Sequence, residues 1–187
     1  MSTIITDDIS KYDKFWWEKF YTDFGHHNNA EELNTFAVAG EIVGDKSVID
    51  VGCGEGEASL YFKNYKGIDW SQVAMKRANE RFGNKFTCGD IKDIKDHFDY
   101  ALFSQVFEHL ENPKEYVEKI KKIADKVIVI LPNGDIGKII VDNDRNYLKP
   151  MEDVDYHYAT YNEQDIRDMF GEVEFRNVGC NNLFFIV

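Results

Sequence analysis

The chain has 187 residues, of which 43% are apolar, 14% aromatic and 30% charged, a balance typical of one globular domain with its own core. This composition excludes disordered, collagen-like and low-complexity proteins. Acidic residues outnumber basic ones by 34 to 22, and the formal charge of -12 repels nucleic-acid phosphates and anionic lipid surfaces. We therefore expect a small-molecule partner rather than nucleic acid or a membrane.

The cysteines point to a reducing compartment. Cys53, Cys88 and Cys180 stand far apart and form no Cys-x-x-Cys pair, so neither a disulfide framework nor a cysteine zinc site is expected. No basic segment precedes an apolar stretch near residue 1, and the longest apolar runs are too short to span a bilayer. These features predict a cytoplasmic protein without a signal peptide.

Two amphipathic helices are predicted first, over residues 9–24 and 31–43. The first carries an aromatic group: Tyr12, Phe15, Trp16, Trp17 and Tyr21. Core packing is the usual fate of such a stripe, but this group is too large for one helix face. We therefore expect Trp16 and Tyr21 to reach a substrate, and we interpret segment 1–46 as a helical lid or cap of the same domain.

From residue 47 to 187, short β-rich runs alternate with helical patterns, which is typical of a parallel α/β sheet. Helices are predicted after Ser71, Asn112 and Asn162, each of which is a good N-cap residue. The segment 135–161 reads as irregular. Seven strands are predicted, the last two forming a hairpin that reverses the final strand, at 47–51, 65–68, 85–88, 98–103, 127–131, 173–178 and 183–187.

The richest motif is the glycine-rich turn over residues 50–56, Asp-Val-Gly-Cys-Gly-Glu-Gly, directly after the first strand. Its glycines let the backbone approach a ligand, and a following helix would offer free N–H groups. A dinucleotide site would place its third glycine at position 57, but the chain has Glu57 there and Gly56 one residue earlier. The turn therefore predicts a ligand site that differs from a dinucleotide site.

Acidic residues end the next two strands. Asp69 stands where a carboxylate can accept hydrogen bonds from both hydroxyls of an adenosine ribose, and Asp90 where one can accept from the adenine amino group. Trp70 either stacks on the adenine or belongs to the core. Together with the turn, these residues predict a nucleoside site at the carboxyl ends of the strands.

Four segments, 48–56, 67–71, 88–91 and 98–110, resemble successive motifs of the class I S-adenosylmethionine-dependent methyltransferases. The similarity runs from about Ser47 to the C-terminus and is closest to the group with ubiquinone-pathway O-methyltransferases and many sugar and natural-product enzymes. It implies a Rossmann-like seven-stranded sheet of order 3-2-1-4-5-7-6, with strand 7 antiparallel and helices on both faces. It also implies that residues 47–187 bind S-adenosylmethionine and release S-adenosylhomocysteine.

The resemblance assigns roles to single residues. Gly52 and Gly54 would approach the methionyl part of the cofactor, Asp69 would hold its ribose, and Asp90 and Ile91 would frame its adenine. The other residues it places at the cofactor are Asp50, Cys53, Gly56, Trp70, Ser104 and Gln105.

A general base is needed only where the acceptor must lose a proton. The candidates are His109, after the fourth strand, and His157, and a structural histidine is the alternative for each. Some relatives bind a divalent cation through Glu-x-x-Glu-His. Here Glu108 and His109 match that pattern, but Gln105 replaces the first glutamate and is a weaker ligand for a hard cation. We therefore expect no metal.

These patterns favour an S-adenosylmethionine-dependent methyltransferase acting at oxygen or nitrogen of a small molecule, such as a sugar, a quinone precursor or a natural product. Two alternatives stay open. One is a metal-assisted RNA 2′-O-methyltransferase using Glu108, His109 and His157. The other is a non-catalytic S-adenosylmethionine-binding partner subunit. The sequence does not indicate the oligomeric state.

Overall fold

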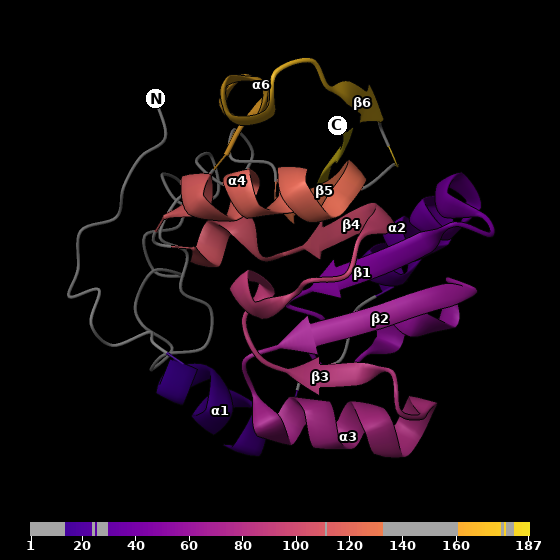
Figure 1. The fold of residues 1–187 in the computed structure, drawn as a ribbon, viewed down its shortest axis with the longest axis vertical. Coiled ribbons are helices and arrows are strands. Elements are labelled where there is room, and N and C mark those ends of the chain that lie inside the picture. Colours follow the sequence, from indigo (N-terminus) through magenta and orange to yellow (C-terminus); the bar gives the residue numbers. More distant parts are fainter. Residues whose placement is uncertain are drawn as a thin grey trace.

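A seven-stranded sheet forms the centre of the molecule in a computed structural model that describes residues 14–23, 25, 30–110, 112–132, 161–176, 178 and 182–187 (Figure 1). Its strand order is β3-β2-β1-β4-β5-β7-β6. β7 runs antiparallel to its neighbours β5 and β6, whereas the other neighbouring pairs are parallel. The expected order and the reversed last strand are confirmed. The strands are β1 (Ser47–Val51), β2 (Asn64–Asp69), β3 (Phe86–Cys88), β4 (Phe98–Ser104), β5 (Ala124–Pro132), β6 (Glu174–Arg176) and β7 (Asn182–Ile186).

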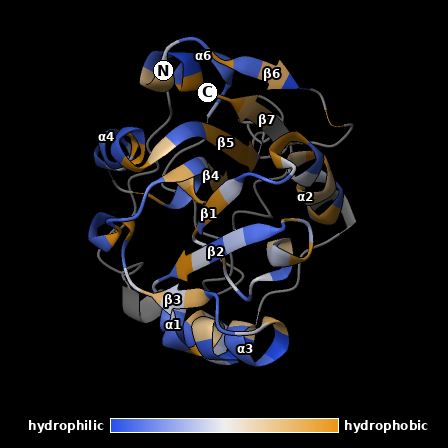
Figure 2. Ribbon diagram, turned by 45° about the vertical axis from the view of Figure 1, so that its right-hand side comes forward, coloured by the Kyte–Doolittle hydropathy of each residue, from blue (hydrophilic) through white to orange (hydrophobic). Residues whose placement is uncertain are grey.

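Helices cover both faces of this sheet, as expected. Figure 1 shows α4 in front of the strands and α2 behind them, and Figure 2, turned by 45°, separates the two on opposite sides. α1 and α3 lie together near β3 in both views. The bounds of the helices are α1 (Lys14–Asp23), α2 (Ala30–Val43), α3 (Gln72–Phe82), α4 (Pro113–Ile123) and α6 (Glu163–Phe170).

The central strands are buried on both sides, which explains their nearly continuous apolar sequence. Successive side chains of a strand point to opposite faces. Ile49 and Phe103 therefore pack in the cluster under α4 and α6, while Val48 and Leu102 pack in the cluster under α1, α2 and α3. The described part of segment 1–46 thus shares its core with the sheet. No helix within the described ranges is long and apolar enough to cross a membrane.

Local capping chemistry sets the starts of two helices as expected. The Ser71 hydroxyl accepts a hydrogen bond from Ala74 N (3.1 Å), and Asn162 forms a capping box with Asp165. Asn112 is the N-cap residue of α4 but makes no side-chain cap. Its amide instead donates to Glu115 Oε1 (2.8 Å), so the capping interaction expected there is wrong.

The crossover from β1 to β2 contains no α-helix. The glycine-rich turn leads into a single 3-10 turn, η2 (Glu57–Leu60), and β2 already begins at Asn64, so an α-helix has no room to form. The expectation of a helix that offers free N–H groups at this point is therefore wrong. α2 covers the sheet here instead: a Cβ on its Gly40 would lie 2.3 Å from the Tyr61 carbonyl oxygen.

Candidate functional site

A pocket opens at the carboxyl ends of β1, β2, β3 and β4. Its empty volume is about 630 Å³, including space that is open to solvent. In open α/β sheets this edge is where ligands usually bind. The lining is mostly apolar and aromatic and consists of Trp17, Tyr21, Val51, Gly52, Ile68, Asp69, Trp70, Gly89, Ile91, Gln105, Val106, His109, Leu110 and Tyr116.

The glycine-rich turn forms part of the pocket wall. Gly52 has a left-handed backbone (φ 72°), and its N–H donates to the Ile68 carbonyl (2.8 Å). A Cβ at this position would lie 2.6 Å from Val106 Cγ2, so only glycine lets the turn approach β4 this closely. The turn therefore presents bare backbone to whatever occupies the pocket.

Asp69 connects the turn to the start of α3. Its Oδ2 accepts from Gly54 N (3.0 Å) and its Oδ1 accepts from Ser71 N (2.9 Å). Burial raises the pKa of this carboxyl, although the backbone N–H donors oppose that shift. The Trp70 backbone N–H is a further donor to this carboxylate, which offers about four lone-pair sites, so Asp69 keeps acceptor capacity for a ligand hydroxyl.

Some of the residues that follow β2 and β3 line the pocket, and others support its wall. Trp70 and Ile91 line the pocket, as does Tyr116 of α4. Asp90 lies outside the lining: its carboxylate accepts from Lys92 N (2.8 Å) and caps the 3-10 turn η3 (Ile91–Asp93). Burial is the main cause that raises the pKa of the Tyr116 phenol, and the charge of Asp90 adds to it.

The end of β4 brings Gln105 and His109 to the pocket. Gln105 adopts a left-handed backbone (φ 57°), the sole positive φ outside glycine among the described residues, and its N–H donates to Ile130 O (2.8 Å). Such a conformation costs energy and recurs at functional sites. Ser104 pairs with Ile130 in the sheet and lies outside the lining. Glu108 is buried, with 1% of its surface exposed.

Three turn residues assigned to the cofactor lie behind the pocket wall. The Asp50 carboxylate accepts from the Tyr65 hydroxyl (2.5 Å), and burial raises the pKa of Asp50 to about 7. Cys53 Sγ lies 3.9 Å from Met75 Sδ. Gly56 has φ 83°, and a Cβ there would lie 2.4 Å from the Phe86 ring. In the structure these residues hold the turn in place from behind.

α1 supplies aromatic side chains to the pocket. Tyr21 lines it, and burial strongly raises the pKa of its phenol, with the Asp69 charge adding to the effect. Trp17 also lines the pocket and meets the His109 ring edge-on, with centroids 5.0 Å apart. Sequence reasoning grouped Trp17 with the aromatic residues but did not assign it to the site. The Trp16 side chain and His157 lie outside the described residues.

Sequence reasoning also missed the apolar lining residues Gly89, Val106, Leu110 and Tyr116. Val106 and Leu110 lie inside the segment 98–110 that carried the resemblance, so the motif could have identified them as lining residues. Tyr116 sits on the buried face of α4 and carried no signal beyond core packing.

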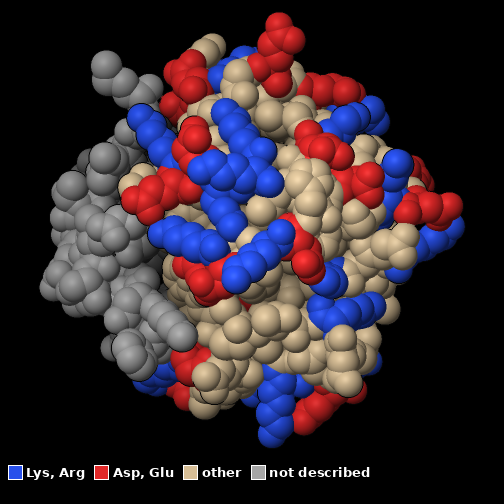
Figure 3. Space-filling view, viewed as in Figure 1, with Lys and Arg blue, Asp and Glu red and all other residues tan. Residues whose placement is uncertain are grey.

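The described part of the chain holds no group of three His, Cys, Asp or Glu side chains that could bind a metal ion. Charges of both signs are intermixed on the face shown in Figure 3. Lys92 pairs with Glu115 (2.9 Å) and Lys66 with Asp96 (2.7 Å), so acidic partners neutralise these two lysines.

Comparisons with known proteins agree with this geometry. A family model described as a methyltransferase domain matches residues 21–179. An uncharacterized protein of Methanocaldococcus jannaschii is 26% identical over 145 residues, which cover 73% of this chain and 68% of that protein.

Two solved structures share the fold. One is an S-adenosylmethionine-dependent methyltransferase of Thermotoga maritima, described as a possible histamine N-methyltransferase, with a TM-score of 0.66, 14% identity, and 93% of this chain and 97% of that chain covered. The other is the magnesium protoporphyrin IX methyltransferase of Synechocystis with bound S-adenosylhomocysteine, with a TM-score of 0.62, 17% identity and 92% of each chain covered.

Proposed function

Because this chain belongs to the class I S-adenosylmethionine-dependent methyltransferases, we propose that it transfers a methyl group to an oxygen or nitrogen atom of a small molecule. One observation carries the proposal: the bare turn at Gly52, the carboxylate of Asp69 and the strained Gln105 converge on a single pocket. They come from the ends of three different strands, as expected of a site assembled by the sheet.

The residues around the pocket support a cofactor assignment part by part. Asp69 keeps acceptor capacity for a ribose hydroxyl, and Trp70 and Ile91 offer apolar contact for an adenine. Gly52 and Gln105 both line the pocket, and a Cβ at Gly52 would lie 2.6 Å from Val106, the residue after Gln105; the methionyl part would lie at this side.

When bound, S-adenosylmethionine supplies a methyl group that its sulfonium has already activated. An acceptor lone pair would displace the sulfur from that methyl carbon, and the electrons of the broken carbon–sulfur bond would return to sulfur. The chain then contributes mainly by orienting the acceptor and excluding water, effects worth about 7–11 kcal/mol at best. Trp17 and Tyr21 are the aromatic residues placed to exclude water.

His109 is the candidate general base, because it lines the pocket next to Trp17 and Gln105. It would take the proton that a hydroxyl or ammonium acceptor loses, a step that typically contributes about 10²–10⁴-fold. His157 stays a second candidate from sequence alone.

Isothermal titration calorimetry with S-adenosylhomocysteine tests the cofactor assignment. We expect Asp69→Ala to weaken binding by about 10–100-fold, the loss of hydrogen bonds to a charged group. Asp93→Ala is the matched control, because this exposed carboxylate lies on η3 outside the pocket and should leave the affinity unchanged. Folded wild-type protein that does not bind, or equal losses in both variants, would contradict the proposal.

A panel of acceptors with tritiated S-adenosylmethionine tests the reaction. It includes amines, phenols, sugars and a short RNA. Heterocyclic amines are among the amines because one structural neighbour is described as a possible histamine N-methyltransferase. Label transfer to a small molecule in the presence of a chelator is the expected result. Transfer to RNA alone, abolished by the chelator, would favour the metal-assisted alternative. Cofactor binding without transfer to any acceptor would favour the non-catalytic one.

A further inference from the structure

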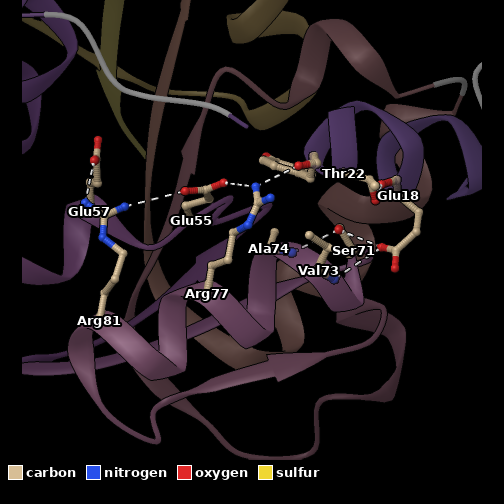
Figure 4. Close-up of polar contacts among 10 residues, drawn as sticks. Glu18, Thr22, Glu55, Glu57, Ser71, Val73, Ala74, Arg77 and Arg81 are labelled. Carbon is tan, nitrogen blue, oxygen red and sulfur yellow. Dashed lines mark hydrogen bonds and ion pairs between the residues drawn. The ribbon is translucent and has the colours of Figure 1, made fainter. Parts of the chain in front are cut away.

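α1 is attached to α3 by two polar connections (Figure 4). In the first connection, the Glu18 carboxylate accepts from Ser71 Oγ (2.7 Å) and from Val73 N (3.4 Å). In the second connection, Arg77 Nη1 donates to the Tyr21 carbonyl oxygen (2.7 Å) and to Glu55 Oε1 (2.8 Å). One connection holds the middle of α1 and the other its last turn, so both orient the helix on α3.

Both connections lead back to Asp69. Its Oδ1 accepts from the N–H of Ser71, the residue whose hydroxyl binds Glu18. Its Oδ2 accepts from the N–H of Gly54, which directly precedes the Glu55 that binds Arg77. The carboxylate assigned to the ribose is therefore joined to α1 by two separate routes.

α1 in turn completes the pocket. Trp17 and Tyr21 are four residues apart and lie on one side of the helix, where both line the pocket. Glu18 follows Trp17 directly and reaches α3 instead. The Trp17 ring meets the His109 ring edge-on, with centroids 5.0 Å apart. The position of α1 therefore sets where two aromatic side chains of the pocket lining lie.

The two connections are built from groups that are largely shielded from water. Ser71 is fully buried, and only 5% of the Glu55 side chain is exposed, whereas Arg77 is about two-fifths exposed. A charge-assisted hydrogen bond in such surroundings is stronger than one between exposed groups. The backbone of Gly25, just after α1, lies close to the Arg77–Glu55 pair. A Cβ added at Gly25 would lie 3.3 Å from Glu55 Oε1 and 3.4 Å from Arg77 Nη1.

We propose that α1 is a lid whose closure is linked to cofactor occupancy through Asp69, with Glu18 and Arg77 as the positioning residues. The inference rests on the proposed function, because it takes Asp69 as a ribose-binding group. A ribose held by Asp69 stiffens both routes to α1, and α1 then holds Trp17 and Tyr21 over the acceptor.

The test measures two quantities in the full chain. Hydrogen–deuterium exchange reports the opening of α1, and surface plasmon resonance reports the dissociation rate of S-adenosylhomocysteine. We expect Glu18→Ala and Arg77→Met each to speed exchange of the α1 amides and release of the probe by about tenfold. In the wild type, saturating S-adenosylhomocysteine should slow exchange of the same amides.

Matched controls separate the lid from general destabilisation. Asp23→Asn removes a carboxylate on α1 that pairs with Lys19, and Arg81→Met removes a second arginine that reaches Glu55 but bonds to Glu57 rather than to α1. Neither should change the exchange of α1 or the release rate. If Glu18→Ala or Arg77→Met fails to fold, Glu18→Gln or Arg77→Lys takes its place, and a smaller change in the same direction is expected.

The outcomes distinguish the two proposals. Unchanged α1 exchange in both lid variants would show that the connections do not hold the helix. Faster α1 exchange with unchanged probe release would show that the lid is not linked to the cofactor. A wild type that binds no S-adenosylhomocysteine would overturn the proposed function and the link to the cofactor, while exchange in the free protein would still decide whether Glu18 and Arg77 hold α1.

Discussion

Asp50 is the group whose ionisation should set how the stability of this protein depends on pH. Only 3% of it is exposed, and burial raises its pKa from 3.8 to about 7, with the Asp69 charge adding to the shift. The hydrogen bond from the Tyr65 hydroxyl opposes the shift but does not cancel it. The folded protein therefore keeps a proton on Asp50 at pH values where the unfolded chain has lost it.

The sign follows from proton linkage. Between about pH 4 and pH 7 the native state binds one more proton than the unfolded state, so the free energy of unfolding falls as pH rises through this window. The contribution of Asp50 is fully present below its unfolded pKa and is lost above about pH 7. One pKa unit corresponds to about 1.4 kcal/mol, so the loss between pH 5 and pH 8 is about 2–3 kcal/mol.

Asp50→Asn isolates this effect, because an asparagine carbonyl can still accept from Tyr65 but does not titrate. Urea denaturation at pH 5, 6, 7 and 8 should give a flatter stability curve for the variant, by about 2–3 kcal/mol over the range. Asp99→Asn is the control: the bonds from Ser47 lower the pKa of Asp99, so its window lies below this range. Parallel curves for wild type and Asp50→Asn would refute the reasoning.

Three further predictions concern backbone strain and the base. Gly56→Ala should lower the free energy of unfolding by about 2–4 kcal/mol in urea denaturation, because its Cβ would meet Phe86. Gly44→Ala is the control, because Gly44 also has a positive φ (60°) but its Cβ would meet no atom within 4 Å, so it should cost only about 1–2 kcal/mol; equal losses would argue against the clash. Gln105→Gly should raise the melting temperature slightly, because it relieves about 1 kcal/mol of backbone strain at the positive φ of this residue. The same variant should bind S-adenosylhomocysteine more weakly in calorimetry. A lower melting temperature would mean that the backbone of Gln105 is not strained. His109→Asn should lower kcat about 10²–10⁴-fold once an acceptor is known, and a loss below threefold would remove it as the base.

Much of the fold was readable from short-range patterns. Ser71 and Asn162 were identified as caps because a cap acts on backbone within three residues. Buried strands such as β4 were recognisable because a strand covered on both faces must be apolar throughout. Asp69 was placed at the pocket because a residue that ends a parallel strand lies at the sheet edge.

Other assignments depended on how side chains turn at that edge. Asp50 and Asp90 follow the same strand-end logic as Asp69, yet one faces Tyr65 and the other caps η3. The missing helix after the glycine turn escaped notice because the turn motif is usually followed by one. Here the spacing between Gly56 and Asn64 is too short for it.

The amino-acid sequence by itself determined the alternation of elements, the reversed last strand and the glycine turn with Asp69 beside it, because each depends on residues close together in the chain. Tertiary structure alone decided that Trp17 meets His109, that Glu18 and Arg77 tie α1 to the turn, and that Asp50 holds its proton near neutral pH. Contacts between distant segments and the depth of burial exist only after packing, so no local periodicity records them.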